Sequence, residues 1–179
     1  VFDGLGGSAD RDRALVIMKD SRIGAFGAIA MVLALLAKVS VLALLGAINA
    51  ALLCAALFTA HVVSRTWPLL LIRLMPHVGD AAGSKSKPLA DQISGQSLLT
   101  AFIWCFMALA LVVIAQAATH FIAIDRLSSV LLRALGGALL ASGLVFLWLW
   151  RWFWLRLGGF TGDCLGTTQQ LCELAFYLG

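Results

Sequence analysis

Acidic side chains and glycines gather near both ends of this sequence. The first carboxylates stand in the stretch DGLGGSADRDRALVIMKDSRIGAFG, which runs without a break into an apolar segment; they are Asp3, Asp10, Asp12 and Asp20. Clustered carboxylates repel one another unless a cation neutralises them. Hard oxygen ligands of this type suit Mg²⁺, which shares its coordination sphere with substrate phosphates. The residue types therefore predict metal-assisted phosphoryl or phosphodiester transfer.

A second polar motif, GGFTGD, follows late in the chain at residues 158–163. Its glycines let backbone N–H groups come close to phosphate, and Asp163 adds another carboxylate. We expect the phosphate-binding positions here to be Gly158, Gly159, Thr161 and Gly162. Arginines bind phosphate oxygens in bidentate fashion, and the candidates are Arg22, Arg65, Arg151 and Arg156.

These residues also have structural interpretations. Asp10 and Asp12 fit solvated positions or helix caps better than ligands, whereas Asp3 and Asp20 fit either role. The GGFTGD turn could instead end one helix and begin the next, with Thr161 or Asp163 as the N-cap. The histidines and cysteines are too scattered along the sequence to indicate a metal set or a disulfide scaffold.

Composition places these residues on a membrane protein. The chain is 61% hydrophobic and 12% charged, and several apolar runs of about 20 residues match a hydrocarbon thickness of ~30 Å. We expect an all-α, polytopic helical membrane protein with residues 1–179 as a single integral-membrane domain. Because the sequence starts at Val1 and stops inside an apolar helix, we also expect a piece of a longer protein.

The apolar segments must carry the polar residues to one place. We expect a surface helix at 11–19, capped by Asp10 or Ser8, then about four spans and a partial helix at the C-terminus. The expected spans are 24–45, 48–65, 97–118 and 130–150. The expected connections are a turn at Gly46, a bend at Trp67-Pro68 into the apolar stretch 69–75, a loop at 76–96 and a link at 119–129. A polar segment at 151–163 follows the last span.

The distribution of charge orients these spans. If they alternate, one face receives most of the basic residues and is cytoplasmic by the positive-inside rule; these are Arg11, Arg13, Lys19, Arg22, Arg65, Arg73, Lys85, Lys87, Arg151 and Arg156. Cationic loops of this kind explain the net charge of +4 without a nucleic-acid partner. The same topology brings Asp3, the Lys85 loop and Asp163 to the cytoplasmic surface.

Several strings in the sequence resemble the cobalamin synthase family, the adenosylcobinamide-GDP ribazoletransferases. They are DGLGG, DR, IMKDSRIG and FG in the first 27 residues, Lys38, Ser64-Arg65, and the late GGFTGDCLG with Glu173. The resemblance implies a multi-pass enzyme of the bacterial inner membrane that uses Mg²⁺. Its substrates would be a corrinoid nucleotide, adenosylcobinamide-GDP, and α-ribazole or its 5′-phosphate, giving adenosylcobalamin or its phosphate and GMP.

The resemblance also implies roles for individual residues. Catalytic positions would be Asp3, Lys19, Asp20 and Asp163, with Arg22 at a phosphate and with Asp3, Asp20 and Asp163 as metal ligands. The family's acidic signature begins with a DGLAD-type run that would precede Val1. We therefore expect the chain to hold only the second half of that signature and to be inactive by itself.

Two other classes stay open. A CDP-alcohol phosphotransferase-type membrane enzyme would share the metal and a nucleotide leaving group, but its denser acidic pattern does not fit residues 3–20. A small-solute transporter is suggested by Lys38, ~20 Å into the first span, and by Gly136, Gly137 and Gly143 in the fourth. Lys38 could equally snorkel to the far interface, and the glycines could serve close helix packing.

Overall fold

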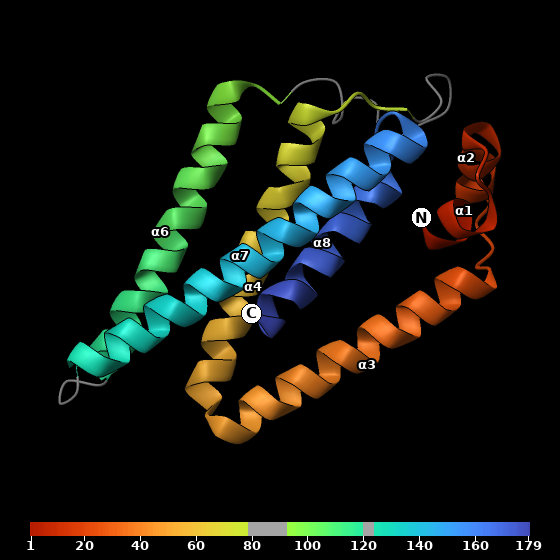
Figure 1. The fold of residues 1–179 in the computed structure, drawn as a ribbon. Helices are drawn as coiled ribbons and strands as arrows, with labels where there is room; N and C mark the ends of the chain where they lie inside the picture. The colour runs from red at the N-terminus through yellow and green to blue at the C-terminus, as the bar shows by residue number, and fades with distance from the viewer. Residues whose placement is uncertain (79–92, 120–123) are drawn as a thin grey trace.

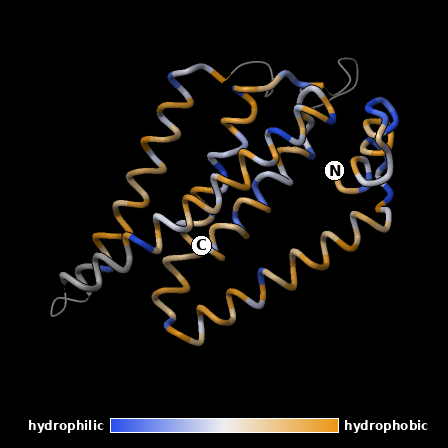
Figure 2. The backbone as a smooth tube through the Cα atoms, viewed as in Figure 1, coloured by the Kyte–Doolittle hydropathy of each residue, from blue (hydrophilic) through white to orange (hydrophobic). Residues whose placement is uncertain are grey.

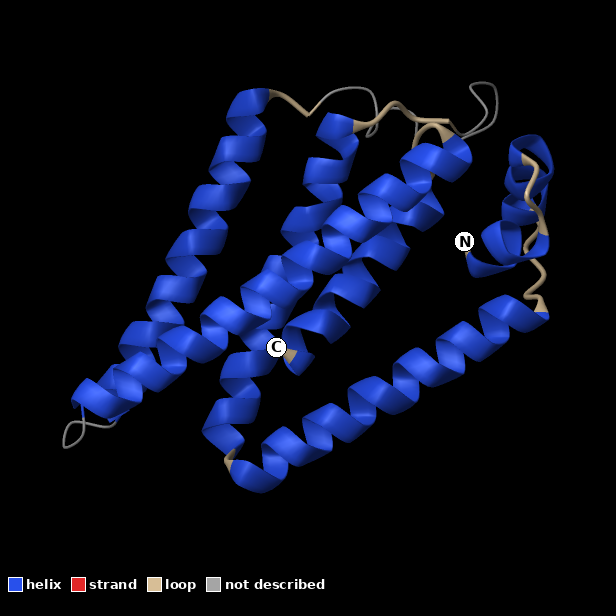
Figure 3. Cartoon of the chain, in the orientation of Figure 1, coloured by secondary structure: helices blue, strands red, loops and turns tan. Residues whose placement is uncertain are grey.

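The computed structural model describes residues 1–78, 93–119 and 124–179, and these ranges are built from α-helices. In chain order the helices are α1 (Phe2–Gly7), α2 (Arg11–Lys19), α3 (Ala25–Ile48), α4 (Ala50–Leu74), α6 (Gly95–Thr119), α7 (Ile124–Leu157) and α8 (Gly162–Leu178). Figure 3 shows no strand in the described part of the chain. The expected all-α class is confirmed.

Four of the described helices are long and apolar enough to cross a bilayer. These segments are Ala25–Ile48, Ala50–Leu74, Gly95–Gln116 and Leu132–Leu157. Figure 2 shows apolar residues along their lengths, with hydrophilic residues gathered on the short N-terminal helices and near the turn that leads into α8. The expected polytopic membrane architecture, with a surface helix at Arg11–Lys19 and a shorter C-terminal helix, is confirmed.

Helix α8 lies at the centre of the packing, side by side with α4 and α7 (Figure 1). Buried side chains of α7 and α8, including Phe153, Leu157, Cys164 and Cys172, belong to one hydrophobic cluster. At the other end of α8, a Cβ on Gly137 would lie only 2.7 Å from the carbonyl oxygen of Gly179. Glycine in α7 therefore permits close helix packing, which is one of the two roles expected for it.

Helix α3 is packed much less closely than α8. None of its side chains is buried, and Figure 1 shows it diverging from the bundle formed by α4, α7 and α8. Its alanine and leucine residues form a helix readily, but without a polar face they do not select one side for burial. The space between α3 and α8 contains a cavity.

The N-terminal helices are held to the end of α7 by two arginines. Arg11 Nε donates to the carbonyl oxygen of Leu157 at 2.7 Å. Arg156 donates to the carbonyl oxygens of Leu5 at 3.0 Å and Ser8 at 2.6 Å. These contacts satisfy helix-end carbonyls that have no partner within their own helix. Arg156, a candidate for phosphate binding, thus anchors α1 and places the first polar stretch beside the α7–α8 turn.

The turn between the first two spans lies at Asn49 and not at Gly46, which is inside α3. Asn49 Oδ1 accepts hydrogen bonds from the backbone N–H groups of Ala51 at 2.7 Å and Leu52 at 3.3 Å. An asparagine at this position supplies the acceptor that the first turn of α4 lacks. A glycine has no such acceptor, which explains why the expected position was wrong.

The expected bend at Pro68 does not end the helix, because α4 continues through this residue to Leu74. Proline removes a helix hydrogen bond, but membrane helices tolerate it where neighbouring helices satisfy the freed groups. Pro68 is buried, and the adjacent Trp67 turns into the bundle, where its Nε1 donates to Ser142 Oγ at 2.7 Å.

The fourth span also extends beyond its expected limits. Helix α7 runs from Ile124 to Leu157, so Arg151 and Arg156 lie on a helix and not in a polar segment. Phe153 and Leu157 on this extension are completely buried, whereas Trp154 and Leu155 are exposed, so the one-sided burial of a helix continues to its end. Residues 120–123 of the expected link, and 79–92 of the expected loop with Lys85 and Lys87, lie outside the described residues.

Candidate active site

A cavity of about 580 Å³ lies between α3 and α8 and is bordered at one end by α1. Asp3, Gly162 and Asp163 line this end, which we call the mouth. Lys38 and Gln170 line the other end, which we call the inner end. The wall between them is mostly apolar and is formed by Ala30, Met31, Ala34, Leu35, Leu171 and Leu174, among others. The cavity thus joins two polar groups of opposite character.

Asp3 caps the N-terminus of α3 from a distance in sequence. Its Oδ1 accepts from the backbone N–H of Gly27 at 2.8 Å, and its Oδ2 accepts from the backbone N–H of Gly24 at 2.8 Å. A Cβ at either glycine would overlap the Asp3 carboxylate, so both positions need glycine. The bonds from Gly27 and then Gly24 hold the pKa of Asp3 below its ordinary value. Asp3 is therefore an anion at neutral pH, and the two hydrogen bonds hold its carboxylate in the lining of the cavity.

Asp163 stands in the first turn of α8, whose N-cap is Thr161. Among the described residues, its exposed carboxylate makes no hydrogen bond or ion pair. No side chain caps this helix, and no atom lies within 4 Å of the position that a Cβ on Gly162 would take. The first N–H groups of α8 are therefore open to an anion at the mouth.

The glycines at the start of the GGFTGD turn have structural roles. Gly158 has a φ of +67°, a left-handed conformation that ends α7. A Cβ on Gly159 would lie 2.4 Å from the carbonyl oxygen of Pro76. This close approach allows Phe160 N to donate to that oxygen at 3.0 Å and Val78 N to donate to Phe160 O at 2.9 Å. Neither glycine lines the cavity, and the helix-to-helix interpretation of the turn is confirmed for this part of it.

Asp20 lies apart from the cavity and is paired with Arg22. Arg22 donates from Nε at 3.1 and 3.0 Å and from a terminal nitrogen at 2.8 Å to the two Asp20 oxygens. The Arg22 side chain lowers the pKa of Asp20, and Asp20 raises the pKa of Arg22. Lys19 lies next to this pair in the last turn of α2. These residues form a polar rim between α2 and α3.

Other expected positions are distributed elsewhere. Asp10 Oδ1 accepts from the backbone N–H of Arg13 at 2.8 Å, so its expected role as a helix cap is confirmed. Arg65 donates to the carbonyl oxygen of His61 at 3.0 Å and lines a shallow groove on α4, away from the mouth. The structure therefore brings Asp3, Gly162 and Asp163 together, but not Asp20 or Arg65.

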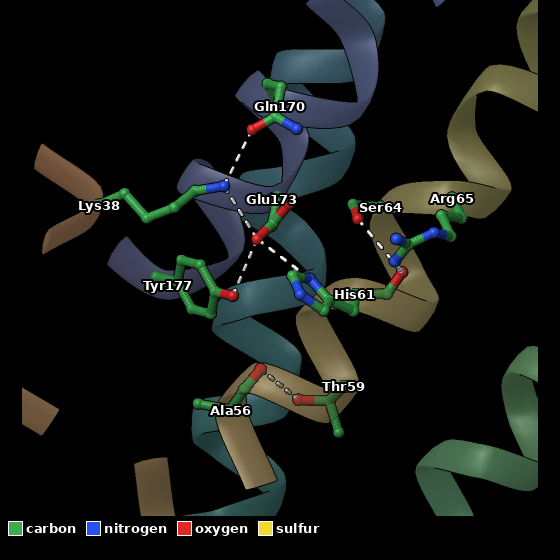
Figure 4. A network of polar contacts seen from close by, with 9 residues as sticks. All are labelled: Lys38, Ala56, Thr59, His61, Ser64, Arg65, Gln170, Glu173 and Tyr177. Atoms are coloured by element: carbon green, nitrogen blue, oxygen red, sulfur yellow. Dashed lines mark hydrogen bonds and ion pairs between the residues drawn. The ribbon is translucent and has the colours of Figure 1, made fainter. Parts of the chain in front are cut away.

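A polar network at the inner end was not foreseen as a site (Figure 4). Lys38 Nζ donates to Gln170 Oε1 at 2.9 Å and to Glu173 Oε1 at 3.0 Å. Glu173 Oε1 also accepts from Tyr177 Oη at 3.0 Å and lies 3.1 Å from His61 Nδ1. Lys38 therefore does not snorkel. The sequence signal was a basic and an acidic residue in two separate apolar helices, a pattern that indicates pairing inside a bilayer.

A magnesium site has support from only part of the expected ligand set. Among the described residues, no group of three or more His, Cys, Asp or Glu side chains is arranged to hold a metal ion. Asp3 and Asp163 share the cavity, whereas Asp20 does not line it. A carboxylate has about four lone-pair positions, so Asp3 can accept two N–H bonds and still contact a hard cation. The two cavity carboxylates therefore fit Mg²⁺ by their chemistry.

Comparison with known proteins identifies relatives of the chain. A relative from Albidiferax ferrireducens named adenosylcobinamide-GDP ribazoletransferase is 72% identical over 179 residues, which are 100% of this chain and 64% of the relative. A relative with the same name from Polaromonas naphthalenivorans is 56% identical, over 100% of this chain and 64% of the relative. Another, from Leptothrix cholodnii, is 45% identical over 99% of this chain and 62% of the relative. No solved structure matches the chain.

The chain thus spans about 64% of the length of the first of these relatives. The sequence model for cobalamin-5-phosphate synthase matches residues 1–179. Because that match covers the whole chain, the chain belongs to the cobalamin-5-phosphate synthase family.

Proposed function

We propose that this chain provides the substrate cavity of a membrane-bound adenosylcobinamide-GDP ribazoletransferase. The observation that carries the proposal is the α3–α8 cavity, which is largely apolar and has Asp3 and Asp163 at one end. A transferase acting on a nucleotide-activated amphiphile needs both features. The carboxylates would hold a cation that contacts the phosphates, and the apolar wall would contact the body of the substrate.

The reaction we propose is a phosphodiester transfer. A hydroxyl oxygen of α-ribazole or its phosphate forms a bond to the phosphorus attached to the corrinoid. The pyrophosphate bond to that phosphorus breaks, GMP leaves with the bonding electrons, and the hydroxyl proton is released. The contribution of the protein is to position the two substrates and to stabilise charge at the mouth of the cavity.

Asp3 and Asp163 are the residues that would hold Mg²⁺, which supplies neutralising charge at the pyrophosphate. Asp3 is suited to this role because the N–H groups of Gly27 and Gly24 keep its carboxylate ionised and immobile. The N-terminus of α8 at Gly162 lies beside them and would bind phosphate oxygen through backbone N–H groups.

The rim formed by Lys19, Asp20 and Arg22 is proposed as a second contact for the nucleotide. The Arg22 side chain is 87% exposed, and its bidentate contact with Asp20 has the geometry that a guanidinium makes with phosphate. A phosphate arriving at the rim could take the place of Asp20. We assign no role in the cavity to Arg65, Gly158 or Gly159, which do not line it.

The activity is tested with the chain in two forms. One form is the chain alone, and the other is a chimera in which it replaces the 179 matched residues of the Albidiferax ferrireducens relative. We expect membranes with the chimera to convert adenosylcobinamide-GDP and α-ribazole into a cobalamin and GMP, with a requirement for Mg²⁺. The chain alone should be inactive. Release of CMP from a CDP-alcohol, or flux of substrate without turnover, would overturn the proposal.

We also propose that the mouth faces the cytoplasm across the bacterial inner membrane. The positive-inside rule supports this orientation, because Arg11, Arg13 and Arg156 lie at this end. The test is labelling of intact cells with a membrane-impermeant maleimide, after Cys54→Ser removes the exposed native thiol. Ala50→Cys at the opposite end should react from outside, whereas Asp12→Cys should react only after the membrane is opened. The reverse pattern would invert the topology.

A further inference from the structure

The inner end of the cavity carries charges that cancel each other. The Lys38 ammonium lies 3.0 Å from Glu173 Oε1, and their side chains are 22% and 2% exposed. An unpaired charge at this depth of a bilayer is costly, so pairing is expected on energetic grounds alone. Pairing also has a chemical consequence. Because the carboxylate neutralises the ammonium, this end of the cavity does not favour an anion such as phosphate.

Glu173 is fixed more firmly than an ion pair requires. The same oxygen that contacts Lys38 also accepts from Tyr177 Oη at 3.0 Å and lies 3.1 Å from His61 Nδ1. Lys38 from α3 and Tyr177 from α8 therefore both donate to one buried acceptor, and His61 of α4 lies close to the same oxygen, as Figure 4 shows. This arrangement leaves little freedom to the Lys38 side chain, which is drawn from α3 toward α8.

Hydrogen-bond donors nevertheless remain at this end. An ammonium has three N–H groups, and two of those on Lys38 go to Gln170 Oε1 and Glu173 Oε1. Gln170 uses its oxygen for Lys38, so its amide nitrogen points away from the lysine (Figure 4). Both residues line the cavity. Donors with little net charge suit a neutral acceptor, such as the oxygen of a carboxamide or a hydroxyl group.

The distance to the mouth defines the kind of ligand. Asp163 and Gln170 both line the cavity and are seven residues apart on α8, which corresponds to about 10 Å along the helix. The wall between them includes Gly166 and Thr167 of α8 and the apolar side chains of Met31 and Ala34 of α3. A ligand that uses the whole length would have phosphate at one end, apolar surface in the middle and a neutral acceptor about 10 Å from the phosphate.

We propose that Lys38 and Gln170 form a binding subsite for a neutral carboxamide or hydroxyl oxygen on the body of the substrate, and that Glu173 acts as the positioning residue for Lys38. The identity of the ligand rests on the proposed function. The amide groups that the name cobinamide denotes have the required chemistry, and the nucleotide end of that substrate would lie at the mouth. The subsite therefore binds the corrinoid body of the substrate and makes no contact with its nucleotide.

Gln170→Leu is the decisive variant. Replacing Lys38 would leave Glu173 buried without its cation and could unfold the protein, whereas Gln170 is exposed to the cavity. Gln169→Leu is the matched control, since Gln169 has the same chemistry at the next position but does not line the cavity. Both variants are made in the chimera and compared in detergent. The probes are cobinamide, which lacks the nucleotide, and GMP, which lacks the corrinoid.

We expect Gln170→Leu to weaken equilibrium binding of cobinamide about three- to tenfold and to raise the KM for adenosylcobinamide-GDP by the same factor. Inhibition by GMP, the KM for α-ribazole and kcat should stay within about twofold, and Gln169→Leu should match the parent in every measurement. Equal cobinamide binding by the two variants in an active parent would overturn the subsite and leave the proposed function standing. A parent that neither binds cobinamide nor forms product would overturn both.

Discussion

The two ends of the α3–α8 cavity differ in whether their charged side chains are paired with an opposite charge. At the mouth, Asp163 makes no hydrogen bond or ion pair among the described residues, and Asp3 is held only by backbone N–H groups. At the inner end, Lys38 and Glu173 neutralise each other at 3.0 Å. The mouth lies between α1 and α8, and the inner end lies between α3 and α8. One end therefore keeps negative charge available for a cation, while the other keeps its charges satisfied.

This difference separates two uses of ionisable residues in one membrane helix pair. Charge exposed to the cavity can act on a substrate and adds little to folding. Charge buried between helices is costly to leave unpaired and therefore orders the helices around it. Substitution of Asp163 at the mouth should affect turnover without affecting stability, whereas substitutions of the buried pair should chiefly lower stability.

The largest effect is expected at the mouth. Asp163→Asn removes an anion from the cavity while keeping its size, and we expect turnover by the chimera to fall about 100-fold or more. Because Asp163 is exposed, the unfolding temperature should not change. Asp12→Asn, at an exposed position on α2, is the control and should retain activity. Equal turnover by the two variants would remove Asp163 from the active site.

The next effect tests the buried pair. Glu173→Gln leaves Lys38 without its counter-charge inside the bundle, and we expect a loss of about 3 kcal/mol in the free energy of unfolding. Combining it with Lys38→Met removes the unpaired charge and should recover much of that loss. Denaturant unfolding in detergent measures both proteins. Additive losses in the double variant would show that the two residues do not stabilise each other.

The smallest effect concerns the cap that Asp3 provides to α3. Hydrogen bonds from Gly27 and Gly24 lower the pKa of Asp3 below its ordinary value of 3.8. A lowered carboxylate pKa stabilises the folded form above pH 3.8, and this stabilisation declines as the pH falls through the folded pKa. Amide-exchange protection at Gly24 and Gly27 should therefore weaken in acid in the parent. In Asp3→Asn the protection should be low and should lose this pH dependence.

Much of the fold could be read from the sequence. Long apolar runs predicted membrane helices, because hydropathy and helix length are local properties that the bilayer thickness makes decisive. The surface helix at Arg11–Lys19 followed from its cap at Asp10, which acts over three residues. Helix ends were less predictable. Asn49, Pro68 and Arg151 were misjudged because the neighbouring helices and caps determine where a helix stops.

The candidate site was predictable by residue type and only partly by position. Asp3 and Asp163 were both named from motifs, and the tertiary structure places them on one cavity although 160 positions separate them. Asp20 carries the same chemistry, but Arg22 holds it outside the cavity. Spacing along the chain could not distinguish these carboxylates, because an aspartate near a helix end looks the same whether it caps, pairs or faces a ligand.

The sequence by itself determined that charged residues such as Lys38 and Glu173 lie within apolar helices, since their neighbours along the chain are mostly apolar. Only the tertiary structure decided that these two residues meet, with His61 and Tyr177 on the same oxygen. The physical reason is that α3 and α8 are far apart in the sequence, so no local interaction brings them together. Their pairing depends on how α4 and α7 pack, and a buried charge finds its partner only after that packing is set.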